Sequence, residues 1–105
     1  MTESTTIAAV TLAEFKRTTT DTKLPASLSP ALQALWQDAR GDWESAHQTA
    51  QSIEDETGAW IHAYLHRKEG DASNAGYWYR RAGRPLCRAS LETEWEEIAS
   101  ALLNP

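Results

Sequence analysis

Two glycine–aspartate pairs, Gly41-Asp42 and Gly70-Asp71, constrain this chain more than any other feature of its sequence. Glycine favours the backbone that ends a helix, and aspartate caps the first turn of the helix that follows. Each pair therefore predicts a tight turn between two helices. The pairs stand 29 residues apart (70 − 41 = 29), which indicates two copies of one helix–turn–helix unit.

Apolar residues flank both turns at the spacing of an α-helix. The first unit carries them at Leu32, Leu35, Trp36, Ala39, Trp43, Ala46, Ala50 and Ile53. The second unit carries them at Trp60, Ile61, Tyr64, Leu65, Ala72, Ala75, Tyr79 and Ala82. Steps of three and four residues place each set on one helix face, and no segment alternates as a strand would. The sequence predicts a first helical hairpin over 30–54 and a second over 58–83, with a break at the acidic run and Gly58.

Two further helices are expected outside the hairpins. The threonine-rich segment 1–29 contains Thr11 three residues before Glu14, the spacing of a capping box, which predicts a short helix over 11–18. Ser90 is placed to cap a last helix over 90–103. A hydrophobic content of 41% in 105 residues suits a single globular domain. The expected fold is all-α, with two stacked antiparallel helical hairpins between an N-terminal and a C-terminal helix.

The second hairpin resembles a tetratricopeptide or Sel1-like repeat. Its matching residues are Ala63, Gly70, Ala75, Tyr79, Ala82 and Pro85, and the string YWYRRAG is especially Sel1-like. The first hairpin matches at Ala34, Gly41 and Ala46 but has Ala50 where an aromatic residue is usual. The resemblance covers about residues 31–85, and the whole string is similar to small bacterial proteins. The repeat of 29 residues is shorter than the usual tetratricopeptide period of about 34. The resemblance implies a scaffold that binds a protein or peptide, with no catalytic residue.

We expect the partner to lie in a groove lined by the second hairpin. The candidate binding residues are His62, His66, Tyr77, Arg81 and Arg84. Arginines beside aromatic rings suit an acidic protein or peptide, and the net charge of −5 argues against nucleic acid. Assembly of the chain into a homo-oligomer is an alternative to binding a different partner. Within the chain, the alternative partners for the arginines Arg80, Arg81, Arg84 and Arg88 are the glutamates Glu92, Glu94, Glu96 and Glu97.

A metal-dependent or small-molecule-binding enzyme is the alternative function. His62 and His66 stand four residues apart on a predicted helix, so both rings can reach one ion, with Glu69 as a third ligand. Ala63 stands where a zincin motif requires glutamate, and buried histidines more often only pack and form hydrogen bonds. We therefore predict no metal and no cofactor. His47, with Asp42 and Glu44, is interpreted as surface charge.

Other functional classes find no support in the sequence. Cys87 is the single cysteine, so it cannot form an intrachain disulfide, and we interpret it as an ordinary thiol. Neither a phosphate-binding glycine loop nor a nucleophile elbow occurs. The start MTESTTIAAV has no cationic leader, and no window approaches the roughly 18–20 apolar residues of a membrane span. We expect a cytoplasmic protein without a membrane partner.

Overall fold

A computed structural model describes residues 11–21, 23, 25 and 28–104 of the protein. It contains the helices α1 (Leu12–Thr18), α2 (Pro30–Ala39), α3 (Trp43–Gln51), α4 (Glu56–Lys68), α5 (Ala72–Ala82) and α6 (Leu91–Leu103). Those residues form no β-strand, so the predicted all-α class is confirmed. The start of the threonine-rich segment, residues 1–10, lies outside the described residues.

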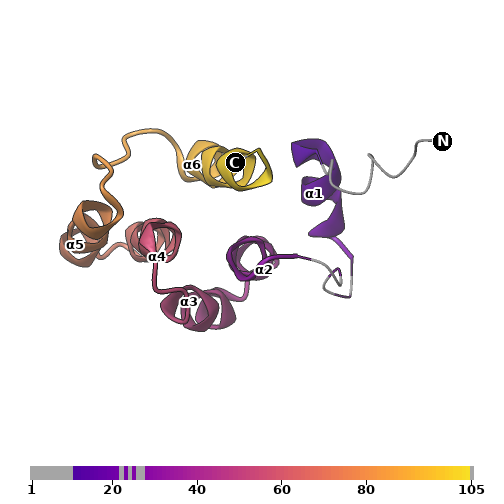
Figure 1. Ribbon diagram of the computed structural model, residues 1–105, viewed down its shortest axis with the longest axis horizontal. Helices are drawn as coiled ribbons and strands as arrows, with labels where there is room; N and C mark the ends of the chain where they lie inside the picture. The colour runs from indigo at the N-terminus through magenta and orange to yellow at the C-terminus, as the bar shows by residue number, and fades with distance from the viewer. Residues whose placement is uncertain (1–10, 22, 24, 26–27, 105) are drawn as a thin grey trace.

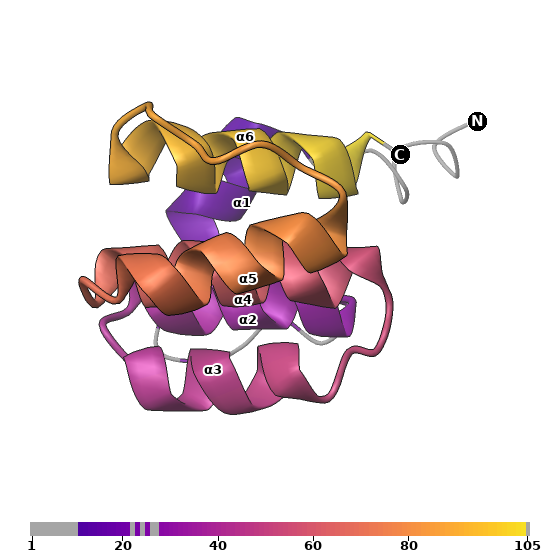
Figure 2. The ribbon, with the colours of Figure 1, turned by 90° about the vertical axis from the view of Figure 1, so that its left-hand side faces the viewer.

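The helices form layers around α2 and α4. Figure 1 shows α3 below this pair and α6 above it, with α1 at the edge beside α6. In the turned view α5 lies alongside α4 (Figure 2). The closest packing is between α4 and α5 and between α2 and α3, while α3 also contacts α4 and α6 contacts both α2 and α4. The C-terminal helix therefore covers the face of α2 and α4 that lies opposite α3.

The helix ends follow the capping residues in the sequence. Thr11 and Glu14 form the predicted capping box. The Thr11 N–H donates to Oε1 of Glu14 at 3.0 Å, and the Glu14 N–H donates to Oγ1 of Thr11 at 3.1 Å. At the two turns, Gly41 and Gly70 adopt φ values of +86° and +93°, a left-handed backbone that glycine adopts without strain. The aspartate after each glycine accepts a hydrogen bond from the first turn of the next helix. The two predicted turns are confirmed.

The core contains large apolar side chains and alanines that let helices approach closely. Leu35, Ile61, Leu65 and Ile98 are fully buried. The indole N–H groups of buried or half-buried tryptophans reach backbone carbonyls, such as Trp95 Nε1 to Leu35 O at 3.0 Å. These bonds satisfy the polar edge of rings that otherwise fill the gaps between helices. No helix in the described part of the chain combines the length and the apolar composition that a membrane span requires.

The predicted break between the hairpins lies at residues 52–55 and includes the first two acids of the run, but Gly58 is not part of it. Helix α4 begins at Glu56 with Asp55 as its N-cap, and Gly58 lies buried in the first turn. A Cβ atom at Gly58 would overlap the carbonyl oxygen of Ile53 and lie 2.8 Å from the Ile53 Cβ. The glycine is therefore required by the close approach of the α3–α4 connection, and not by a turn.

Replacing Gly58 with alanine is expected to lower the free energy of unfolding by about 1–3 kcal/mol, because backbone atoms must move to admit the methyl group. Gly76→Ala is the matched control. It also lies inside a helix, but its Cβ would meet nothing closer than 3.7 Å, so that variant should gain about 0.5–1 kcal/mol. Urea denaturation of both variants measures the difference. Equal effects of the two substitutions would contradict this account of Gly58.

Candidate functional site

A groove runs between α5 and the loop that follows it. Its cavity of about 460 Å³ is lined by Ala72, Ser73, Gly76, Tyr79, Arg80, Arg84, Pro85 and Leu86. Leu86 is 57% exposed and presents its apolar side chain in the lining of this groove. The groove thus combines an apolar wall with two arginines and has no carboxylate in its lining.

Four exposed arginines on α5 and the loop after it have no carboxylate partners in the described residues, and two of them, Arg80 and Arg84, line the groove. Within the described ranges, no Asp or Glu oxygen lies within 4 Å of the guanidinium nitrogens of Arg80, Arg81, Arg84 and Arg88. The alternative, a pairing of these arginines with the glutamates of the last helix, does not occur among the described residues. Glu94 instead binds Arg67 at 2.7 Å, and Glu96 binds Lys16 at 2.6 Å. The arginine cluster therefore keeps its hydrogen-bond donors available.

Aromatic rings hold two of these arginines in place. Arg81 lies over the rings of Tyr77 and Trp78, at 5.9 and 5.3 Å from their centroids, and donates to the Tyr77 hydroxyl at 3.1 Å. Arg84 lies 3.3 Å above the centroid of Trp60. Such stacking fixes the guanidinium plane while leaving its N–H edge free to bind an acceptor. Tyr77 is itself 43% exposed.

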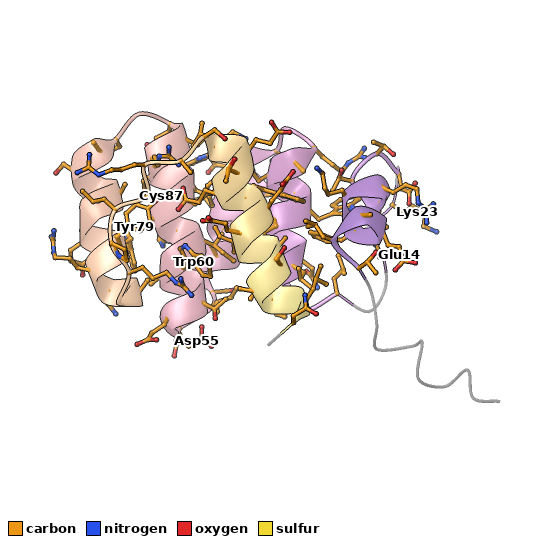
Figure 3. The ribbon with its side chains drawn as sticks, turned by 90° about the horizontal axis from the view of Figure 1, so that it is seen from above. Glu14, Lys23, Asp55, Trp60, Tyr79 and Cys87 are labelled. Atoms are coloured by element: carbon orange, nitrogen blue, oxygen red, sulfur yellow. The ribbon has the colours of Figure 1, made fainter. Side chains whose placement is uncertain are left out.

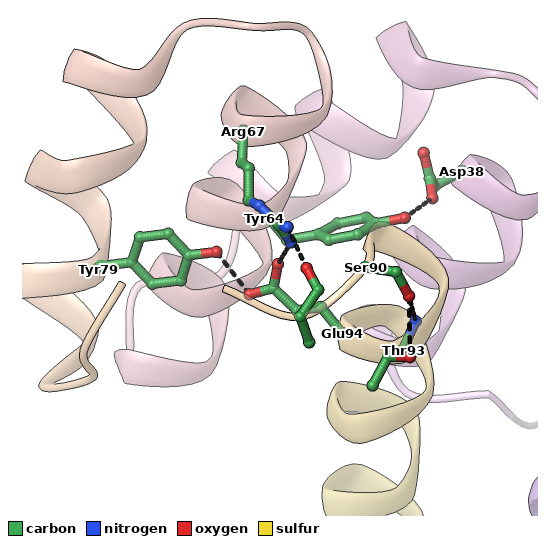
Figure 4. Close-up of polar contacts among 8 residues, drawn as sticks. Asp38, Tyr64, Arg67, Tyr79, Ser90, Thr93 and Glu94 are labelled. Atoms are coloured by element: carbon green, nitrogen blue, oxygen red, sulfur yellow. Dashed lines mark hydrogen bonds and ion pairs between the residues drawn. The ribbon is translucent and has the colours of Figure 1, made fainter. Parts of the chain in front are cut away.

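The buried carboxylate of Glu94 binds Tyr79, a residue that lines the groove. Glu94 is 1% exposed and accepts hydrogen bonds from the Tyr79 hydroxyl at 2.5 Å and from Arg67 at 2.7 Å (Figure 4). Arg67 also donates to the carbonyl of Ala89, at the end of the loop. Burial, followed by the bond to Glu94, raises the pKa of the Tyr79 hydroxyl, so Tyr79 stays a donor at neutral pH. This network joins α4, α5 and α6 and fixes where the loop enters α6.

His62 and His66 lie away from the groove, in the interior. They are 4% and 7% exposed and face His47 of α3. Burial, followed by the neighbouring His47 and His66, lowers the pKa of His62 to about 4. Burial also lowers the pKa of His47, with His66 as the next cause. The histidines and the arginines of α5 meet at Trp78. His62 stacks on Trp78 with 3.9 Å between the ring centroids, and Arg81 lies over the same indole.

Sequence reasoning missed His47 and Glu94. We interpreted His47 as surface charge and Glu94 as a partner of the α5 arginines, but tertiary packing turns both side chains inward. Trp43, four residues before His47, carried a usable signal, because rings at this spacing share a helix face. The rings of Trp43 and His47 stack with 4.8 Å between their centroids.

Three comparisons with known proteins complete the description of the site. No protein-family model matches the chain. No curated protein and no solved structure matches it either. The tetratricopeptide or Sel1-like resemblance therefore stays a prediction that rests on the sequence pattern.

Proposed function

We propose that this protein is a small helical interaction module that binds an acidic peptide along α5 and the loop after it. The observation that carries the proposal is a set of four exposed arginines without carboxylate partners in the described residues, two of which, Arg80 and Arg84, line a groove with an exposed leucine. Arginine guanidinium groups bind carboxylates through two parallel hydrogen bonds. A protein of net charge −5 that leaves such a cluster unneutralised is suited to a partner that supplies the carboxylates.

The dimensions of the groove indicate the size of the bound segment. Helix α5 has 11 residues and is therefore about 16 Å long. An extended peptide covers that length with about five residues, whose side chains alternate in direction. Carboxylates on one side would reach Arg80 and Arg84, while an apolar side chain on the other would contact Leu86. Glutamate alternating with leucine is the simplest sequence with this pattern.

The test is direct binding of a labelled peptide. Fluorescence anisotropy would follow a fluorescein-labelled peptide of about eight alternating Glu and Leu residues, with a Lys–Leu peptide as the charge-reversed probe. Binding of the acidic peptide alone is expected, and it should weaken as salt rises because exposed charges are screened. The double variant Arg80→Gln/Arg84→Gln should lose affinity by about tenfold or more, which corresponds to about 1.4 kcal/mol.

Lys23→Gln is the matched control, since it removes one exposed positive charge at the α1 end, far from Tyr79 and the groove (Figure 3). That variant should bind as the parent does. Equal binding of the two peptides, no binding, or an unchanged affinity in the arginine double variant would each overturn the proposal. Tighter binding of a single-stranded oligothymidylate than of the acidic peptide would overturn it in favour of nucleic acid.

A further inference from the structure

The interior of the protein gathers every histidine of the chain. The sequence contains three, and all of them meet where α3 packs against α4. One nitrogen of each ring can be chosen so that the three atoms lie within 4.8 Å of one another. The Nε2 atoms of His47 and His62 are only 2.9 Å apart. The centroid of His66 lies 4.9 Å from that of His62 and 5.1 Å from that of His47.

One polar atom of this cluster has no partner. The Nδ1 atom of His66 is buried and forms no hydrogen bond with any residue that the structure describes. The nearest carboxylate oxygen with which it could pair, Oε2 of Glu69, is 3.7 Å away, beyond hydrogen-bond distance. Buried polar atoms without partners are rare because no hydrogen bond offsets their desolvation. A cation coordinated by this nitrogen would give it the partner that it lacks.

The rings are held by tryptophans that give them few other orientations. Trp43 stacks on His47 at 4.8 Å, with 10° between the planes, and Trp78 stacks on His62 at 3.9 Å and 11°. The stacking therefore pre-organises two of the three rings of the cluster.

An acidic cavity reaches His62, one member of the cluster. Its volume is about 580 Å³, and it includes His62, Trp78 and the three consecutive acids 54–56. Three carboxylates at the entrance raise the local concentration of cations and provide an entry path. Arg81 is the one cationic side chain in the lining, and it lies over Trp78.

We infer that His47, His62 and His66 form a binding site for a divalent d-block cation, of which zinc is the representative. Three imidazole nitrogens are a ligand set that zinc accepts, at about 2.0–2.1 Å each. Tetrahedral geometry then separates the donors by about 3.3 Å, close to the 2.9 Å between the first two Nε2 atoms. His66 completes the set by a small movement of its ring. This site is independent of the peptide groove, and neither proposal requires the other.

The test uses the full chain after removal of metal with a chelator. Isothermal titration with zinc chloride near pH 7.5 should give one ion per chain, and cobalt(II) should give the visible spectrum of a tetrahedral site. His47→Gln keeps a hydrogen-bonding side chain near His62 but removes a ligand. We expect it to weaken zinc binding at least about 100-fold, the upper end of the loss that follows even from removing an outer-shell partner. Glu92→Gln, an exposed acid on α6, is the matched control and should leave binding unchanged.

A measurement on the unaltered chain keeps the inference testable if His47→Gln does not fold. Imidazole nitrogen NMR should show that all three histidines shift together as one equivalent of zinc is added. Absence of binding would overturn the inference. So would binding that survives His47→Gln in a folded variant, or that leaves the imidazole signals unchanged, since the ion would then sit on surface carboxylates.

Discussion

Replacing Arg67 with methionine is expected to lower the free energy of unfolding by about 3–5 kcal/mol, because it leaves the buried Glu94 without its cation. The aliphatic part of the side chain is retained, so little packing is lost. What disappears is the 2.7 Å bond to a carboxylate that is 1% exposed, together with the bond to the Ala89 carbonyl. Among the described residues, the Tyr79 hydroxyl would then be the one hydrogen-bond donor left to the Glu94 carboxylate. Urea or guanidinium denaturation followed by circular dichroism measures the loss.

The double variant Arg67→Met/Glu94→Gln separates the buried charge from other effects. Glutamine keeps an acceptor for the Tyr79 hydroxyl but carries no charge, so the double variant should recover much of the stability that Arg67→Met loses. A double variant no more stable than the single one would contradict this assignment.

Local sequence rules predicted most of the helices. The sequence identifies Thr11, Asp42, Asp71 and Ser90 as caps, and it identifies the turns at Gly41 and Gly70, two of the three left-handed glycines in the described residues. These features depend on residues within one or two helical turns, so a single sequence contains the information. The error at Gly58 has a different origin. Its constraint comes from the approach of Ile53, which only the folded connection brings close.

The candidate site was less predictable because its contacts join distant parts of the chain. Glu94 stands in a run of exposed-looking acids, yet it pairs with Arg67, 27 residues earlier. The i, i+4 spacing indicated that His62 and His66 share a face, but it could not indicate His47 on the preceding helix. Arg84 is a candidate binding residue in the sequence together with Tyr77 and Arg81. The chain instead leaves the helix after Ala82, and Arg84 lies over Trp60.

Replacing Phe15 with alanine is expected to lower the free energy of unfolding by about 3–5 kcal/mol, the usual cost of removing a buried phenylalanine ring. Phe15 is 1% exposed and stacks on Trp95 of α6, with 5.5 Å between the ring centroids and 9° between the planes. Helix α1 has only seven residues, and a helix that short is not stable alone in water. Its position therefore depends on this contact, and hydrogen exchange of the α1 amides should accelerate together with the loss of stability.

Lys16→Met, on the same helix, is the matched control. Lys16 pairs with Glu96 of α6 at 2.6 Å, but both side chains are substantially exposed, at 46% and 34%. Exposed pairs contribute about 0–1 kcal/mol, because solvent screens the charges and ordering two long side chains costs entropy. The comparison tests whether α1 is held by its buried ring or by its surface charge. If Phe15→Ala cost no more than Lys16→Met, the docking of α1 through the core would be refuted, because apolar burial is the larger contribution at this contact.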